Sequence, residues 1–134
     1  MEMTFTFPGG AREDGQVGPH VVKTDQPPDP TAPSPFTLFL ASIGACAGVY
    51  VQSFCRRRGI PMDGIRIVQR NVTGPDGMVE RVELDIQLPP DFPERYREAV
   101  VRAADQCTVK QHLELPPLIA VRATTAQREE VGAV

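Results

Sequence analysis

The chain has 134 residues, which is enough for one domain with a core but too few for two. Its 41% hydrophobic and 23% charged residues favour a folded chain over a disordered one. The net charge is −3 and no lysine- and arginine-rich stripe alternates with aromatic residues, which argues against nucleic acid as a partner. We therefore expect a single folded domain over residues 1–134.

The N-terminus and the cysteines bear on the cellular compartment. The start, Met1 to Thr4, carries an acid and no apolar run, so no secretory signal peptide is expected. Three cysteines without such a signal fit a reducing cytoplasm, where thiols stay available for reactivity or packing. No metal or other cofactor is expected, because the chain has no CxxC pair and only two histidines, His20 and His112.

The N-terminal part of the chain predicts two strands and a connector. Alternation over residues 3–7 is typical of a strand, Pro8 to Gly10 interrupts it, and residues 12–15 predict a polar turn. Residues 17–24 predict a second strand that pairs with the first. Five prolines between residues 25 and 35 then indicate an extended connector.

Residues 31–55 carry no charged side chain and predict a long, buried helix. Pro35 confines its start to about Phe36, and Gly59 to Pro61 ends it. The helix is apolar nearly all round, and a sheet from one subunit covers only one of its sides. A homodimer that packs these helices centrally is therefore expected.

The same helix is long enough to span a bilayer, and Arg56 to Arg58 follow it as a basic flank. Serine, threonine and glutamine side chains dilute its hydrophobicity, so we favour a helix in a protein core over a membrane span. The three arginines are interpreted as a solvated helix end that complements the helix dipole, rather than as an anion site.

The second half of the chain predicts a hairpin, two helices and a strand. Residues 65–73 and 79–88 alternate apolar and polar side chains around a Gly-Pro-Asp-Gly turn. Pro93 opens a second helix, residues 108–115 match a capping box and a short third helix, and residues 118–125 predict a last strand. The expected order is β-β-α-β-β-α-α-β, an α+β domain with antiparallel sheet.

Two of the three cysteines are candidates for a dithiol/disulfide couple. Cys46 lies in the long helix, and Cys107 lies on the buried stripe of the second helix, directly before the third helix. The dipole of that third helix is expected to stabilise a thiolate near its start. Cys55 is ~13 Å from Cys46 along the helix axis, too far to bridge. Free cysteines are also common as small buried hydrophobes, so a packing role is the alternative for each.

Three segments in combination resemble the OsmC/Ohr family of osmotically inducible and organic hydroperoxide resistance proteins. They are Ala32 to Phe36 before the long helix, Ala41 to Cys46 within it, and Ala103 to Cys107 with the helix that follows. The resemblance spans essentially the whole chain, including the order of elements. It implies an OsmC-like fold in which two subunits intertwine, each contributing a long central helix to the homodimer.

The resemblance also implies a thiol peroxidase that reduces organic hydroperoxides and is itself reduced by an external dithiol. By position in the motifs, Cys46 corresponds to the peroxidatic thiol and Cys107 to the resolving thiol. Gly9 to Gly15 resembles the hairpin from which family members supply an arginine, which makes Arg12 the candidate. A guanidinium lowers the pKa of a nearby thiol and can hold a peroxide oxygen. The alternative for Arg12 is an exposed charge in a turn.

One position departs from the family pattern. The peroxidases place a glutamate shortly after the proline before the long helix, where it orients the arginine, but Pro35 to Thr37 contain no acid. Asp25, Asp29 and Glu13 are the candidates to replace it. Two functions therefore remain: a thiol peroxidase, and a non-catalytic dimer that binds a small apolar ligand and uses its cysteines for packing.

Overall fold

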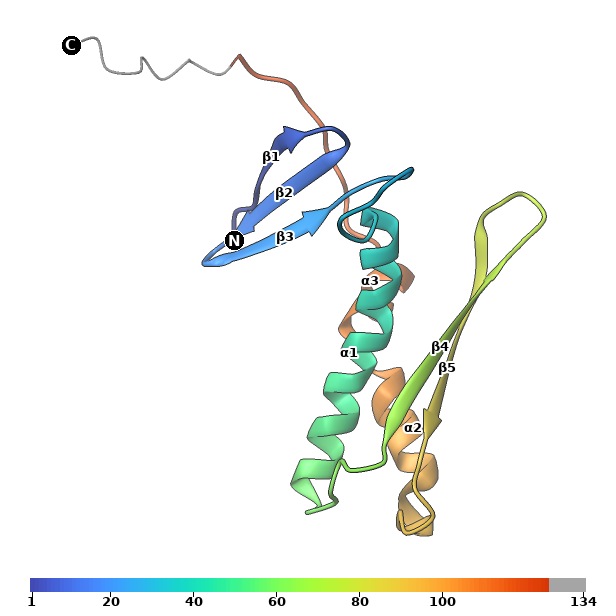
Figure 1. Ribbon diagram of the computed structural model, residues 1–134. Coiled ribbons are helices and arrows are strands. Elements are labelled where there is room, and N and C mark those ends of the chain that lie inside the picture. Colours follow the sequence, from blue (N-terminus) through green and yellow to red (C-terminus); the bar gives the residue numbers. More distant parts are fainter. Residues whose placement is uncertain (126–134) are drawn as a thin grey trace.

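The computed structural model describes residues 1–125 as two antiparallel sheets around one long helix (Figure 1). The N-terminal sheet has the order β1 (Thr4–Gly9), β2 (Arg12–Val17), β3 (His20–Thr24). The second sheet is the hairpin of β4 (Arg66–Thr73) and β5 (Val79–Gln87). The helices are α1 (Pro35–Arg57), α2 (Arg97–Asp105) and α3 (Thr108–Glu114), with a 3-10 turn, η1 (Glu94–Tyr96), before α2. The predicted α+β class with antiparallel sheets is confirmed.

The N-terminal sheet contains one strand more than expected. Residues 12–15, predicted as a turn, form the first part of β2. The turns lie at Gly10 and Gly18, whose φ angles of 58° and 54° suit glycine. β2 was not predicted because its residues are mostly polar, so it lacks the alternation of apolar and polar side chains that indicates a strand.

The long helix α1 begins and ends close to where the sequence predicts. The Ser34 hydroxyl accepts a hydrogen bond from the Thr37 backbone N–H at 3.2 Å, and Pro35 occupies the first turn. At the other end Gly59 adopts a φ of 65°, which terminates the helix. Arginines in the last turn complement the negative end of the helix dipole.

The hydrophobic core lies between α1, α2 and the β4–β5 hairpin. Val51 and Cys55 of α1 and Val100 of α2 are almost completely buried. The hairpin adds the paired residues Ile67 and Ile86, which pack against this cluster from the sheet side. The alternation predicted for the hairpin therefore directs its apolar side chains inward, and this core holds α1 and α2 in place.

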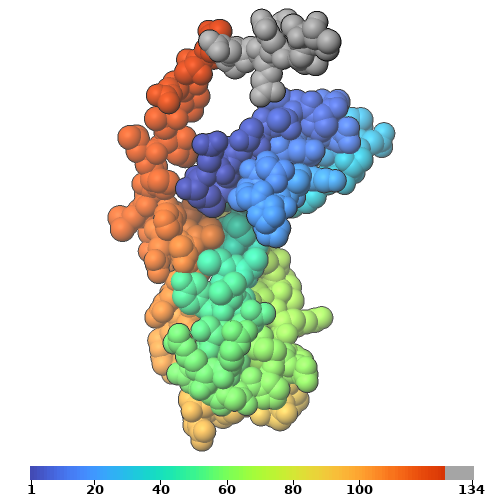
Figure 2. All heavy atoms as spheres, turned by 90° about the vertical axis from the view of Figure 1, so that its left-hand side faces the viewer, coloured from blue at the N-terminus to red at the C-terminus, as the bar shows by residue number. Residues whose placement is uncertain are grey.

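Several apolar side chains of α1 are left exposed within the described part of the chain. Val49 is 60% exposed and Phe36 is 54% exposed, and Figure 2 shows α1, in teal to green, forming part of the molecular surface. α1 has a mean hydropathy of 1.6 over an 18-residue window and is long enough to cross a membrane, and 28% of that window is buried. An apolar surface of this kind calls for a partner outside the chain.

The strand predicted over residues 118–125 does not form in the structure. These residues have no regular secondary structure, and Leu118 and Ile119 are 94% and 80% exposed. A strand needs a neighbour for its backbone hydrogen bonds, and within residues 1–125 none pairs with this segment. The order in the chain is therefore β-β-β-α-β-β-α-α.

Candidate functional site

The fold brings Cys46 and Cys107 into contact. Cys46 lies midway along α1, and Cys107 lies in the short connection between α2 and α3. Their thiols are close enough to shift each other's pKa, and Cys107 Sγ donates to the Ile43 carbonyl oxygen at 3.8 Å. Both cysteines are free, so the structure holds the reduced form of the pair.

The start of α3 is held against α1 beside Cys46. Cys107, not Thr108, is the N-cap residue of α3, and it makes no side-chain capping bond. The predicted capping-box role of Thr108 is therefore wrong. Its hydroxyl instead shares a 2.7 Å hydrogen bond with the Tyr50 hydroxyl of α1. This bond joins the first turn of α3 to α1 one turn after Cys46.

The surroundings of Cys46 stabilise its thiolate. The backbone N–H of Val109 donates to the sulfur and is the largest cause that lowers the pKa of Cys46. Partial burial opposes this shift, whereas the Cys107 thiol and the backbone and hydroxyl groups of Thr108 add to it. Hydrogen bonds to the charged form of a thiol favour that form, so Cys46 is the more acidic member of the pair.

The surroundings of Cys107 favour its neutral thiol. Burial is the largest cause that raises the pKa of Cys107, and the nearby Cys46 sulfur raises it further. The sequence led us to expect thiolate stabilisation at Cys107, the residue directly before α3. The backbone N–H groups of Lys110 and Val109 do lower the pKa of Cys107, but burial outweighs them and the pKa is raised. Cys55 has a pKa raised by burial in the core and takes no part in this contact.

Arg12 lies at the start of β2 and is not among the groups that shift the pKa of Cys46. It lines a cavity of about 510 Å³ formed with the Asp25–Thr31 loop. Its positive charge contributes to lowering the pKa of Asp25. The positive charge of Arg12 therefore acts on an acid of the connector.

Asp25, one of the three candidate acids, is held by hydrogen bonds within the connector, and Arg12 contributes to lowering its pKa. The Asp25 carboxylate accepts hydrogen bonds from the backbone N–H groups of Gln26 and Thr31, both at 2.8 Å, and from the Thr31 hydroxyl at 2.9 Å. The bond from the Thr31 backbone is the largest cause that lowers its pKa. Asp25 is 5% exposed, and these bonds hold it in a fixed orientation.

A small apolar cavity of about 130 Å³ adjoins the cysteine pair. Cys107 forms part of its wall together with Ile43 of α1, Leu84 of β5 and Val101 of α2. Lys110 and Asp105 stand at its border as an ion pair. A compact apolar group fits beside the Cys107 sulfur in this space.

Sequence reasoning missed the groups that lower the pKa of Cys46. The donors are backbone amides of residues 108 and 109, and backbone groups carry no residue signature. The helix start predicted directly after Cys107 did locate these amides. It did not show that they face the sulfur of Cys46. Among residues 1–125 no group of three His, Cys, Asp or Glu side chains could hold a metal ion.

Comparison with known proteins places the chain in a family. The family model of the OsmC-like proteins matches residues 27–122, which include both cysteines. A comparison with curated proteins gave no match.

Solved structures share the fold at low sequence identity. A protein of Psychrobacter arcticus 273-4, described as belonging to the osmotic stress induced and detoxification response, superimposes with a TM-score of 0.68 and 20% identity over 81% of this chain and 85% of its own. A structural genomics protein gives 0.70 and 20% identity over 87% and 91% of the two chains. A hypothetical protein from Aquifex aeolicus VF5 gives 0.67 and 17% over 86% and 87%. The family match over most of the chain, together with this shared fold, shows that the chain belongs to the OsmC-like family.

Proposed function

We propose that this protein is a thiol-dependent peroxidase that reduces organic hydroperoxides through Cys46 and Cys107. The observation that carries the proposal is the contact between these two thiols, whose pKa values are shifted in opposite directions. A peroxidatic cysteine has to be a thiolate to attack, and a resolving cysteine has to lie within reach of the oxidised sulfur. The lowered pKa of Cys46 and the nearness of Cys107 support these two roles.

The proposed cycle has three steps. The Cys46 thiolate attacks the terminal peroxide oxygen, the O–O bond breaks, and the alcohol leaves after taking up a proton, so that Cys46 becomes a sulfenic acid. Cys107 then attacks the Cys46 sulfur, and water leaves as the disulfide forms. An external dithiol reduces this disulfide by two successive thiol–disulfide exchanges and is itself oxidised.

The cavity beside Cys107 supports an organic rather than an inorganic peroxide. Its walls include the side chains of Ile43, Leu84 and Val101, which offer no charge to a polar substrate. An apolar substituent of the hydroperoxide gains free energy by leaving water for such a surface. The hydroperoxide group would then lie next to the two sulfurs.

We also propose that the active form is a homodimer in the cytoplasm. The apolar side of α1, on which Val49 is 60% exposed, supports the dimer because a second copy of the same helix would cover it. Three free thiols support a reducing compartment, in which a dithiol reductant is available.

Arg12 remains the proposed cation of the site. The resemblance of its hairpin to that of the family supports this role, and Asp25 supplies the acidic partner that Pro35 to Thr37 lack. If Arg12 acts on Cys46 in the assembled protein, Arg12→Ala should raise the Cys46 pKa, and Arg12→Lys should restore charge without the two-pronged geometry. pH-dependent alkylation of a Cys55→Ser, Cys107→Ser background measures this. A Cys46 pKa indifferent to both changes would remove Arg12 from the site.

Stoichiometric oxidation with cumene hydroperoxide tests the peroxidase directly. We expect a Cys46–Cys107 disulfide, with Cys55 left as a free thiol, in peptide maps after alkylation. Cys107→Ser should stop the reaction at a Cys46 sulfenic acid, and Cys55→Ser is the matched control that should behave like the parent. A Cys46–Cys55 link, or no intramolecular disulfide, contradicts the mechanism.

A non-catalytic binding protein is the second candidate. The lack of an acid in Pro35 to Thr37 favours it, because the site then lacks the glutamate that would orient the arginine. In that case the apolar cavity binds its ligand irrespective of the thiols, and the doubly substituted Cys46→Ala, Cys107→Ala protein should bind as well as the parent. The oxidation experiment then shows no turnover with any hydroperoxide.

A further inference from the structure

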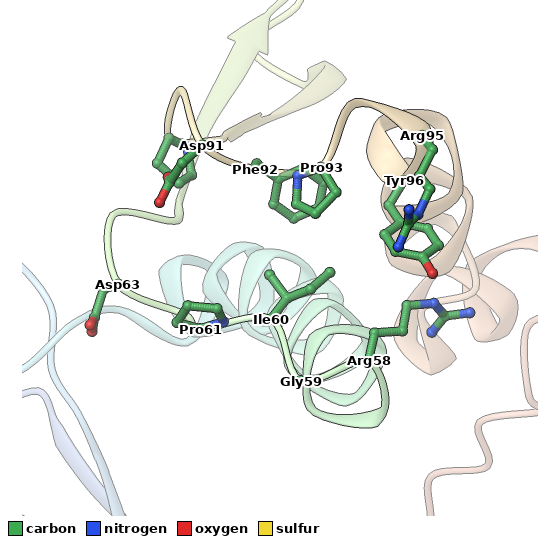
Figure 3. Close-up of a pocket in the computed structure, with 11 residues that line it drawn as sticks. Arg58, Gly59, Ile60, Pro61, Asp63, Asp91, Phe92, Pro93, Arg95 and Tyr96 are labelled. Atoms are coloured by element: carbon green, nitrogen blue, oxygen red, sulfur yellow. The ribbon is translucent and has the colours of Figure 1, made fainter.

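A second cavity lies at the C-terminal end of α1, whereas Cys46 lies in the middle of that helix. It has a volume of about 370 Å³ and is formed by the turn after α1 and the segment that leads from β5 into η1 (Figure 3). Arg58 at its edge follows Cys46 by twelve residues, or about 18 Å of helix. The proposed peroxidase does not use this space. Its volume falls within the range of about 300–1,000 Å³ that is usual for small-molecule sites.

One end of this cavity is cationic. The Arg58 guanidinium lies 3.7 Å from the centre of the Phe54 ring, and its Nη1 donates to the Phe54 carbonyl oxygen at 3.1 Å. The Arg95 guanidinium lies 4.8 Å from the centre of the Tyr96 ring. Neither arginine has a carboxylate partner within residues 1–125. A guanidinium stacked on an aromatic ring keeps N–H donors at its edge, which suit a carboxylate.

The other end of the cavity is anionic. Asp63 and Asp91 stand across from the arginines and Tyr96 in Figure 3. In the described part of the chain, neither aspartate forms an ion pair. Their negative charges are therefore free to attract a cation. An ammonium group of a ligand would supply the opposite charge at this end of the cavity.

The middle of the cavity is apolar. Figure 3 shows Ile60, Pro61, Phe92 and Pro93 between the two charged ends. Phe92 is 5% exposed and belongs to the hydrophobic core, so this floor is rigidly supported. A ligand with a hydrocarbon chain between two charged ends would place each part against a matching surface.

We propose that this cavity binds a zwitterion whose ammonium and carboxylate groups stand at opposite ends of a short apolar chain, an ω-amino carboxylate. The carboxylate contacts Arg58 and Arg95, the ammonium contacts Asp63 and Asp91, and the chain lies on Phe92. An α-amino acid does not fit this pattern, because both of its charges sit on one carbon. A simple carboxylate or a simple amine satisfies only one end.

Four probes test the proposal: 6-aminohexanoate, hexanoate, hexylamine and leucine. We titrate each into the isotope-labelled, full-length protein and follow the backbone amide resonances of Gly59, Ile60 and Phe92. We expect 6-aminohexanoate to bind tightest, with hexanoate and hexylamine each weaker by about fivefold, since one ion pair is then missing. Equal affinity for hexanoate or hexylamine, or no shifts with 6-aminohexanoate at tens of millimolar, overturns the proposal.

Variants assign the two ends. Asp91→Asn should reduce the affinity for 6-aminohexanoate about fivefold, to that for hexanoate, and Arg95→Gln should reduce it to that for hexylamine. Arg70→Gln on β4 and Asp76→Asn in the hairpin turn are the matched controls and should bind like the parent. If the controls lower the affinity as much as the cavity variants, the binding is nonspecific and the proposal is wrong. Cys46→Ser should leave binding unchanged, so this test does not depend on the peroxidase.

Discussion

Cys46 and Cys107 are in contact, yet their pKa values are shifted in opposite directions. The Cys46 sulfur accepts hydrogen bonds from backbone N–H groups at the start of α3, whereas the Cys107 thiol donates a hydrogen bond to the Ile43 carbonyl oxygen. At neutral pH the pair therefore consists of one group inclined to be a thiolate and one that retains its proton. In the proposed cycle, these hydrogen bonds would favour Cys46 as the thiol that attacks first.

Thr108 offers a direct test of this arrangement. Thr108→Val removes a hydroxyl that helps to lower the Cys46 pKa, so alkylation of Cys46 near neutral pH should slow by about two- to threefold. Thr108→Ser keeps the hydroxyl and is the control. The rates are measured with iodoacetamide on a Cys55→Ser, Cys107→Ser background. Equal rates for the valine variant and the parent would show that the hydroxyl is irrelevant.

Asp25 predicts a dependence of stability on pH. Its pKa is lowered from 3.8 chiefly by the Thr31 and Gln26 hydrogen bonds, so its charged form stabilises the fold above that value. This contribution should be lost as the pH falls through the lowered pKa of the folded state. Asp25→Asn should therefore unfold at lower urea than the parent at neutral pH, and the difference should disappear in strong acid. Asp29→Asn, exposed on the same loop, is the control. A difference that persists unchanged in acid contradicts this account.

At the level of residues, the sequence predicted which two cysteines come together, but not the groups that surround them. Cys46 and Cys107 stand in recognisable motifs, and the fold brings them together. The donors to Cys46 are main-chain groups, which any residue type supplies, so composition and spacing carry no trace of them. The position of Arg12 depends on how a hairpin docks against a helix far along the chain, and local pattern does not determine such docking.

Helix α1 and strand β4 approach closely at two glycines of the helix. Gln69 of β4 donates from Nε2 to the Leu40 carbonyl oxygen at 2.8 Å, and its Oε1 occupies the space of a Cβ on Gly44. One turn later a Cβ on Gly48 would meet Ile67 Cδ1 at 3.8 Å, an ordinary contact. A Cβ at Gly44 would therefore clash with Gln69, whereas a Cβ at Gly48 would fit.

These glycines give a matched pair of variants. Gly48→Ala should stabilise the protein by about 0.8–1 kcal/mol, because alanine is the better helix former and finds room. Gly44→Ala gains the same propensity but displaces Gln69 and its hydrogen bond, worth about 0.5–1.5 kcal/mol, so its net effect should be near zero or destabilising. Urea unfolding monitored by circular dichroism measures both. Equal stabilisation by both substitutions would show that Gln69 moves without cost.

Elements with a strong hydrophobic period were predictable, and polar or unpaired ones were not. The β4–β5 hairpin and α1 follow their alternation and their helix stop signals closely. β2 was not predicted because its side chains are polar on both faces. Its strand conformation depends on pairing with β1 and β3. Residues 118–125 carry strand-forming side chains, but strand formation requires a partner that the described chain does not supply.

At the level of the whole molecule, the described chain has more apolar helix surface than it covers. Isolated exposed apolar residues are normal, but the 23-residue helix α1 exposes Phe36, Phe39 and Val49. A second copy of the chain is the proposed cover. A membrane is the alternative cover, and flotation with lipid vesicles distinguishes the two. A dimer with buried helices should not float with the vesicles.

Val49 tests the proposed dimer. Val49→Asp places a charge on the exposed side of α1, where it would be buried between subunits, so the protein should lose its dimer and aggregate or unfold. Met78→Asp, at an exposed apolar residue of the β4–β5 turn, is the control and should stay dimeric. Light scattering gives the mass of each. A parent that is a stable monomer at micromolar concentration, or a folded dimer of Val49→Asp, contradicts the proposal.

The segment 107–109 carries both the proposed resolving thiol and the amides that hold the Cys46 thiolate. Formation of a disulfide would remove the negative charge from Cys46, and a neutral disulfide sulfur is a poor acceptor for the N–H groups of Thr108 and Val109. The same event would tie the residue before α3 covalently to α1. If the proposed disulfide forms, the exchange of these two amide protons with solvent would depend on the oxidation state of the protein, and the first turn of α3 would report it.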